Sequence, residues 1–279
     1  MDSLVTALVR SYAAVVAARF RMLLQYRAAA LAGIATQIFW GCIKLMVFGA
    51  FYAVAVTTPP MTFTAIVAYV WLGQVLIGLL PWNHDPELQE LFMSGGVAYE
   101  LLRPLDLYWF WFARTLAYRT APTLLRMVPG ICFATLVLPL IGLPEWALPA
   151  PASVTHGLLF SASFLATVLL SCAITILITI SMFWMIEGRG IATFMYGVVP
   201  VFSGMIVPLP LFPDWMQPFL QWQPFRGLCD VPFRIYSGDI PLAMASQEIA
   251  LQFAWAVILI LFGYGLIARA RTRLVVQGG

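Results

Sequence analysis

Charged residues are scarce in this 279-residue sequence. Only 10% of its residues are Asp, Glu, Lys or Arg, whereas 62% are hydrophobic, and its mean hydropathy is +0.91. A soluble globular domain carries about 25% charged residues, so the composition excludes a soluble globular protein. Because a membrane span needs roughly 20 apolar residues, the chain has room for about six spans and for no large soluble domain.

The residue types that catalytic sites need are also scarce. Lys44 is the single lysine and Leu45 follows it, which excludes a Walker A loop because that loop needs Ser or Thr after its lysine. The two histidines, His84 and His156, are expected on opposite sides of the membrane, so they cannot share a metal ion. The sequence also lacks a G-x-S-x-G nucleophile elbow. We therefore expect neither an enzyme activity nor a bound cofactor in this chain.

Cysteine is rare as well. The four cysteines, Cys42, Cys132, Cys172 and Cys229, show no C-x-x-C spacing, and three of them lie in apolar runs. This pattern is typical of small core residues and not of a disulfide or metal framework. The net charge of +3 is small, so the arginines bear on membrane topology and not on a nucleic-acid partner.

What the sequence does contain is a series of long apolar segments. Six are predicted to span the membrane, at about residues 28–56, 61–80, 123–143, 157–186, 191–207 and 249–268. Segment 1–27 has apolar residues at helical spacing and scattered arginines, which is typical of an amphipathic interfacial helix and not of a cleaved signal peptide. The predicted fold class is therefore an all-α membrane protein that ends in a short tail, 269–279.

A polar segment, Glu90–Asp106, separates the second and third predicted spans. The sequence predicts two short helices here, Pro86–Met93 and Val97–Arg103, with Gly95-Gly96 between them and Pro104 at the end. Periodicity alone leaves two interpretations open, an ordinary loop or a docking surface.

Arginine distribution predicts the orientation. With six spans and a cytoplasmic N-terminus, only Arg226 and Arg234 lie outside, whereas twelve cations lie inside: Arg10, Arg19, Arg21, Arg27, Arg103, Arg114, Arg119, Arg126, Arg189, Arg269, Arg271 and Arg273. Positive charge is favoured on the cytoplasmic side. Both termini and the polar segment are therefore predicted to be cytoplasmic.

Polar residues within the spans allow two interpretations each. Lys44 either extends toward the lipid headgroups or joins Gln37 in a polar pathway. The fourth span carries a hydroxyl at every fourth position, which indicates either close helix packing or a polar lining: Ser163, Thr167, Ser171, Thr175 and Thr179.

The segment between the fifth and sixth spans, 208–248, is rich in proline and aromatic residues. It is too interrupted to cross lipid as one helix. Phe212–Trp222 is predicted to form short helices that enter the outer leaflet partway, which requires protein or water to satisfy the backbone.

These patterns together resemble a known family. The polar segment contains Glu90, Gly96 and the sequence Leu101-Leu102-Arg103-Pro104, and the outer segment contains Ser203-Gly204, Pro208-Leu209, Phe212-Pro213-Asp214-Trp215, Pro224-Phe225, Pro232 and Gly238. With the six-span plan, they resemble the permeases of type-2 ATP-binding-cassette exporters over nearly the whole chain. The branch most similar combines two permeases with a separate ATPase, and the resemblance implies the bacterial cytoplasmic (inner) membrane.

The resemblance also implies functional residues. Segment 90–106 becomes a coupling helix that docks on a soluble ATPase, through Glu90, Gly95, Gly96, Tyr99, Glu100, Leu102, Arg103, Pro104 and Asp106. The translocation path is assigned to Gln74, Phe194, Phe202 and Met205, with Lys44 as an added candidate. Val97 and Ala98 stand where related loops more often carry polar residues.

Partners and substrate follow from the same resemblance. The ATPase, in two copies, binds ATP and Mg²⁺, a second identical or related permease completes the path, and re-entrant helices between spans five and six cap its exit. The expected substrate is a lipophilic or cationic small molecule, or a lipid-like one. Two other classes stay open: a secondary transporter, for which internal repeats are expected, and a membrane assembly protein that needs no motor.

Overall fold

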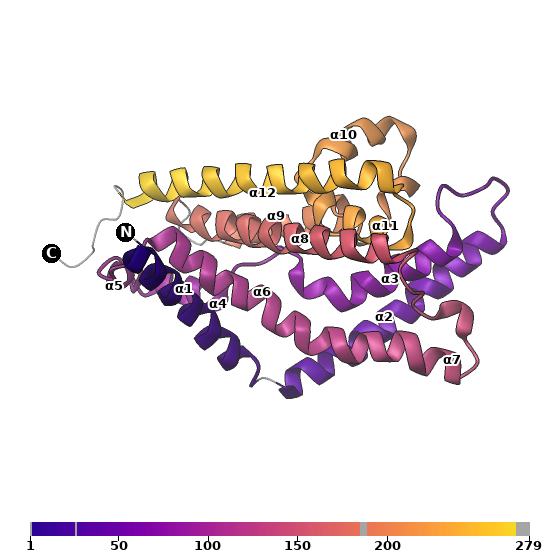
Figure 1. Cartoon of the computed structure of the whole chain (residues 1–279), viewed down its shortest axis with the longest axis horizontal. Helices are drawn as coiled ribbons and strands as arrows, with labels where there is room; N and C mark the ends of the chain where they lie inside the picture. Colours follow the sequence, from indigo (N-terminus) through magenta and orange to yellow (C-terminus); the bar gives the residue numbers. More distant parts are fainter. Residues whose placement is uncertain (1, 26, 185–188, 272–279) are drawn as a thin grey trace.

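The apolar segments of the sequence fold into helices. A computed structural model describes residues 2–25, 27–184 and 189–271, and every regular element in these ranges is helical. The short helices α4 (Pro86–Met93) and α5 (Val97–Glu100) lie near one end of the long axis (Figure 1). Helices α10 (Gln217–Trp222) and α11 (Asp230–Ser237) lie toward the other. We call these the α4–α5 end and the α10–α11 end.

Longer helices build the body of the molecule. They are α1 (Asp2–Leu23), α2 (Arg27–Ala53), α3 (Phe63–Leu76), α6 (Leu107–Cys132), α8 (Val154–Ser181), α9 (Arg189–Phe202) and α12 (Leu242–Arg271). Three of them begin at a side-chain cap, because the oxygens of Thr62, Asp106 and Ser153 accept a backbone N–H three residues further on. Helix α6 continues through a π-helical turn into α7 (Leu138–Leu140).

The prediction of an all-α protein is confirmed for the described residues. Within the part of the chain that the structure describes, four helical stretches are long and apolar enough to cross a membrane: Ala32–Ala53, Leu107–Leu140, Val154–Ser181 and Leu242–Ala270. Helices α3 and α9 are also apolar but shorter. Helix α3 continues through a 3-10 turn, Ile77–Leu79, so this apolar helix extends over Phe63–Leu79, which is slightly shorter than the roughly 20 residues that a regular span needs.

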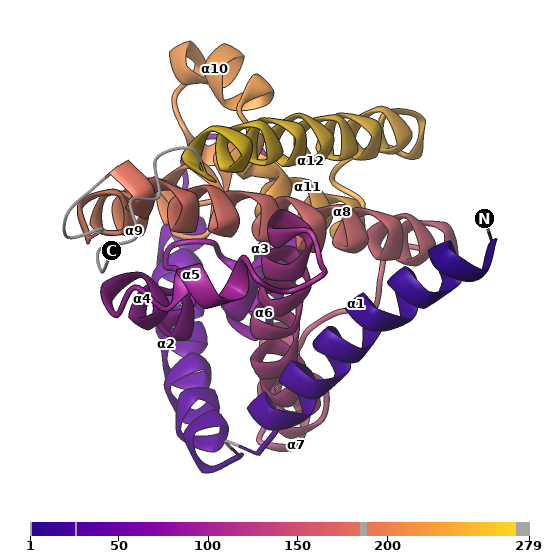
Figure 2. The same ribbon diagram turned by 90° about the vertical axis from the view of Figure 1, so that its left-hand side faces the viewer.

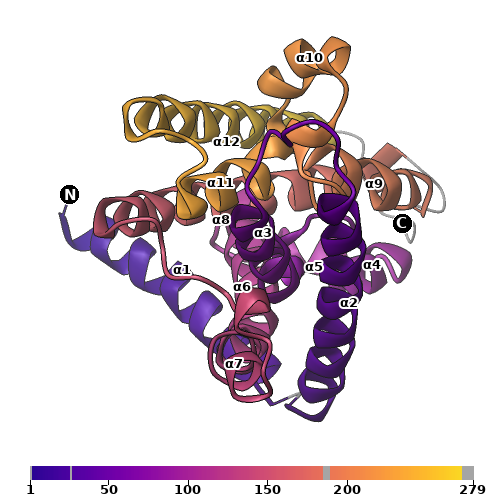
Figure 3. The same cartoon turned by 90° about the vertical axis from the view of Figure 1, so that its right-hand side faces the viewer.

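Helix α3 forms the centre of the bundle. All its residues from Ala65 to Leu76 are buried, and it contacts α2, α6 and α11 (Figures 2 and 3). The outer helices instead expose large apolar side chains, among them Phe39 on α2, Val128 on α6 and Phe262 on α12. An extensive apolar surface of this kind suits contact with lipid tails.

The N-terminal helix crosses α6 obliquely (Figure 2). Tyr12 and Val15 on α1 pack against the hydrophobic core, whereas Leu8 and Val9 are exposed. The helix therefore has one face on the bundle and one face turned away from it, as an interfacial position requires.

The third span begins earlier than predicted. Helix α6 starts at Leu107 and not at residue 123, because Asp106 caps it by accepting the Trp109 N–H over 3.2 Å. Consequently Arg114, Arg119 and Arg126 lie inside α6 and not in a loop before the third span.

Other boundaries also differ. Helix α9 ends at Phe202 and not at 207, since Gly204 (φ +84°) turns the chain, and α12 starts at Leu242 and not at 249. The predicted end of the fourth span at 185–186 and most of the predicted tail, from 272 onward, lie outside the described residues.

The cysteine prediction holds for part of the set. Cys172 and Cys229 are fully enclosed, and Cys42 is half-buried. Cys132 is exposed, so its assignment to the core was wrong. It lies on α6, which also exposes Val128, and Leu136 in the following π-helical turn is exposed as well, so an apolar residue at this surface is not exceptional.

Candidate functional site

The polar segment folds as two short helices joined by a glycine turn at the α4–α5 end (Figure 2). Gly95 has a φ of +71°, a left-handed conformation that residues with a Cβ rarely adopt. At Gly96 an added Cβ would lie 2.9 Å from the Leu91 side chain. The first glycine permits the turn, and the second permits α5 to approach α4 closely.

Five of the predicted docking residues face outward. Tyr99 and Leu102 are 77% and 81% exposed, and Glu90, Arg103 and Pro104 are exposed as well. Here we call these five residues the outer face. The Arg103 guanidinium lies 4.9 Å from the centre of the Phe110 ring, a cation–π contact that orients it beside α6.

Two predicted docking residues face inward. Glu100 is 5% exposed, and its carboxylate accepts the Trp111 Nε1–H over 2.6 Å and an Arg114 N–H over 2.8 Å. Asp106 caps α6, and its backbone N–H donates to the Tyr12 hydroxyl over 3.1 Å. Both carboxylates are therefore bonded to groups of this chain. Their assignment as direct docking contacts stays a prediction, and these bonds within the chain count against it.

A charge cluster joins the polar segment to two long helices. It consists of Arg19, Asp85, Glu87, Glu100 and Arg114. Arg19 on α1 pairs with Asp85 (3.1 Å) and with Glu87. Arg114 on α6 pairs with Glu87 (2.9 Å) and with Glu100 (2.8 Å).

The cluster is a structural link and not a solvated charge run. Arg19 is 9% exposed and Asp85 is fully buried. Burial alone would lower the pKa of Arg19, but hydrogen bonding and attraction to Glu87 and Asp85 outweigh it, so this pKa is raised and the guanidinium stays charged. Removing one partner from a buried pair typically costs about 3–5 kcal/mol, because the other charge is left uncompensated.

Sequence reasoning did not find Arg19, Asp85, Glu87 or Arg114 as partners. Arg19 and Glu87 are 68 positions apart, and no local pattern relates them. The only available signal was the density of acidic residues from 85 to 100, which needs cations in space once it is buried.

A further arginine holds the connection between α3 and α4. Arg119 is 3% exposed and donates to the Leu80 carbonyl over 2.9 Å, to the Asn83 carbonyl, and to the Thr175 hydroxyl on α8 over 3.0 Å. It thereby joins α6 to α8 and to the chain that enters the polar segment.

The hydroxyl stripe on α8 serves packing. All five residues are buried, and Thr167, Thr175 and Thr179 donate to carbonyls one turn earlier. Ser163 donates to Gln252 of α12 over 2.7 Å. The Ser163 bond joins α8 to α12, and the three threonine hydroxyls are satisfied within α8, so the interpretation as a polar path lining is not supported.

The predicted path residues do not converge on one cavity wall. Gln74 and Met205 are buried, Phe194 is 63% exposed, and the Phe202 ring packs edge-on against Phe219. The Lys44 amine donates to the Met205 carbonyl over 2.6 Å. Lys44 thus ties α2 to the turn after α9, which favours an internal polar contact over extension toward the lipid headgroups.

Comparison with known proteins identifies no relative. No protein-family model matches the chain, and no curated protein or solved structure is significantly similar to it. The function of this chain must therefore be inferred from its own residues and their arrangement.

Proposed function

We propose that the chain is the membrane permease of an ATP-driven exporter, and that a separate soluble ATPase docks on the outer face. One observation carries this proposal. Tyr99, Leu102 and Arg103 point away from the molecule, whereas Glu100 in the same short stretch is bonded to α6. Exposed aromatic, apolar and arginine side chains in one patch are typical of protein interfaces.

The charge cluster supports a mechanical role for this surface. A force applied to α5 passes through Glu100 to Arg114 on α6. A force on α4 passes through Glu87 to Arg19 on α1. Arg119 links the same segment to α8, because it bonds both to the Asn83 carbonyl and to the Thr175 hydroxyl. Coupling between distant sites needs a contiguous network of this kind, and a loop without such bonds would absorb the displacement instead.

The proposed assembly contains two permeases and two ATPase copies, and ATP and Mg²⁺ bind to the ATPase. In it α3 and α9 are the two shorter spans of a six-span plan, the α4–α5 end and both termini are cytoplasmic in the bacterial inner membrane, and α10 and α11 lie in the re-entrant cap. The substrate is a lipophilic or cationic small molecule or a lipid-like one. The count of twelve arginines on the predicted cytoplasmic side against two outside supports this orientation.

Co-purification from the native membrane tests the proposal. The full chain, extracted in mild detergent, should bring down a soluble ATPase, and the reconstituted pair should transport cationic dyes or lipids only with ATP and Mg²⁺. An ATPase-free chain whose transport persists without ATP would favour a secondary transporter, and a chain with neither partner nor transport would favour an assembly role.

A further inference from the structure

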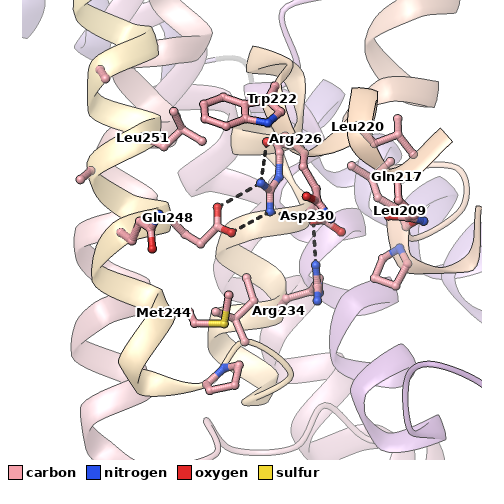
Figure 4. A pocket seen from close by; sticks show the side chains of 17 residues that line it. Leu209, Gln217, Leu220, Trp222, Arg226, Asp230, Arg234, Met244, Glu248 and Leu251 are labelled. Carbon is pink, nitrogen blue, oxygen red and sulfur yellow. Dashed lines mark hydrogen bonds and ion pairs between the residues drawn. The ribbon is translucent and has the colours of Figure 1, made fainter. Parts of the chain in front are cut away.

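A cavity of about 650 Å³ lies at the α10–α11 end, between α10, α11 and α12 (Figure 4). Small-molecule sites typically measure about 300–1,000 Å³. Much of its wall is apolar, including Leu209, Leu220, Trp222, Met244, Leu251 and Ala254. None of the residues assigned to ATPase docking contributes to this cavity.

Four charged side chains also line the cavity. Arg226 pairs with Glu248 through two contacts, Nη1–Oε2 at 3.1 Å and Nη2–Oε1 at 3.2 Å. Arg234 pairs with Asp230 at 3.3 Å, and Asp230 is 1% exposed (Figure 4). Outside the wall, Asp239 also pairs with Arg234. The attraction of Asp230 and Asp239 outweighs burial and raises the pKa of Arg234, so it stays cationic.

The balance of positive and negative side chains in the cavity wall favours one class of ligand. The wall holds two arginines and two carboxylates, so its formal charge is zero. A simple anion would be attracted by the two arginines but repelled by Glu248 and Asp230. A simple cation would be attracted by the two carboxylates but repelled by the arginines. A zwitterion can place its negative group near Arg226 or Arg234 and its positive group near Glu248, which satisfies both signs.

An apolar track continues along α12 beyond the cavity wall. Leu251 lies in its wall, and Ile258 and Phe262 follow seven and eleven residues later on the same face of α12. These two side chains are 52% and 58% exposed. They lie about 10 and 16 Å further along the helix axis, a distance over which an acyl chain can extend. Because α12 is one of the candidate spans, such an exposed apolar track suits contact with lipid tails.

We propose that the cavity binds the zwitterionic headgroup of a phospholipid, with phosphate and ammonium groups as in phosphatidylethanolamine, and that the acyl chains lie along Leu251, Ile258 and Phe262. The site goes beyond the proposed export function, since it requires neither an ATPase nor transport. Its failure would leave ATPase docking intact, and the reverse is also true.

Native mass spectrometry of the full chain in detergent tests this site. Dioleoyl phosphatidylethanolamine should be retained about tenfold more than dioleoyl phosphatidylglycerol, since the latter lacks the ammonium group that pairs with Glu248. Ala254→Trp, which fills the cavity, should abolish this excess. Ala268→Trp is the matched control, because Ala268 is an exposed alanine nearer the other end of the same helix.

A charge variant provides a second readout that loss of folding cannot imitate. Glu248→Gln leaves the wall with one net positive charge, so the preference should shift toward phosphatidylglycerol while circular dichroism and the melting temperature confirm a folded protein. Equal retention of both lipids by the parent chain would overturn the proposal, as would Ala254→Trp behaving like Ala268→Trp. Phosphoethanolamine without acyl chains should bind weakly, and binding equal to that of the lipid would replace the phospholipid with a soluble zwitterion.

Discussion

Arg114 on α6 donates to the Glu100 carboxylate on α5 over 2.8 Å, and this contact fastens the polar segment to a helix long enough to cross a membrane. The same guanidinium reaches Glu87 on α4 over 2.9 Å. One arginine therefore holds both short helices. These internal bonds therefore fix the position of the outer face, which a flexible loop would leave undefined.

Replacing Arg114 tests the cluster. Arg114→Met leaves Glu100 buried without its cation, so the free energy of unfolding should fall by about 3–5 kcal/mol. Thermal unfolding in detergent measures this loss. Arg103→Met is the control, because Arg103 is exposed and contacts the Phe110 ring from the surface, so its loss should cost less than about 1 kcal/mol. Equal melting temperatures for the two variants would contradict the buried link.

Leu102 tests the docking surface. Leu102→Glu alters a side chain that is 81% exposed, so stability should change by less than about 0.5 kcal/mol. Binding of the ATPase should weaken by about 2 kcal/mol or more if Leu102 is an interface anchor. Quantitative pull-down with purified ATPase measures the affinity. Trp215→Glu, at an exposed position of the opposite end, should leave binding unchanged, and the same loss in both variants would argue against a local dock.

Gly204 tests the turn that ends α9. Gly204→Ala combines a φ of +84° with a clash between the new Cβ and the Tyr69 hydroxyl. Backbone strain alone costs about 1–2 kcal/mol. Gly142 is the matched control, since its φ is +85° but nothing lies within 4 Å of an added Cβ. The melting temperature should fall further for Gly204→Ala than for Gly142→Ala. A smaller fall in melting temperature for Gly204→Ala would mean that the Tyr69 side chain moves aside at little cost in free energy.

Lys44 offers a chemical test because it is the single lysine. Its amine is bound to the Met205 carbonyl over 2.6 Å, so an amine-acylating reagent should modify it slowly in the folded protein and rapidly in denaturant. Mass spectrometry of peptides measures both rates. Fast modification in the folded state would restore the interpretation that Lys44 extends to the membrane surface.

The sequence placed Tyr99, Leu102 and Arg103 on a short polar helix as docking contacts, and all three are exposed, as a docking surface requires. Their role in docking stays a prediction. Glu100 and Asp106 are both acidic and lie next to these residues in the sequence, yet both side chains bond within the chain. Glu100 accepts hydrogen bonds from Trp111 and Arg114, and Asp106 caps α6. Charge alone does not distinguish a solvated carboxylate from a buried, paired one.

The sequence by itself determined that this is an all-helical protein with helices apolar enough to span a membrane. Hydropathy and helical spacing are local properties, and the lipid environment requires every backbone group to bond within its own segment. Only the tertiary structure decided which polar residues pair. Arg19 meets Asp85 across 66 positions, and Lys44 meets Met205 across 161. Because burying an unpaired charge costs free energy, a buried charged residue needs a partner, but the packing of the helices determines which residue that partner is.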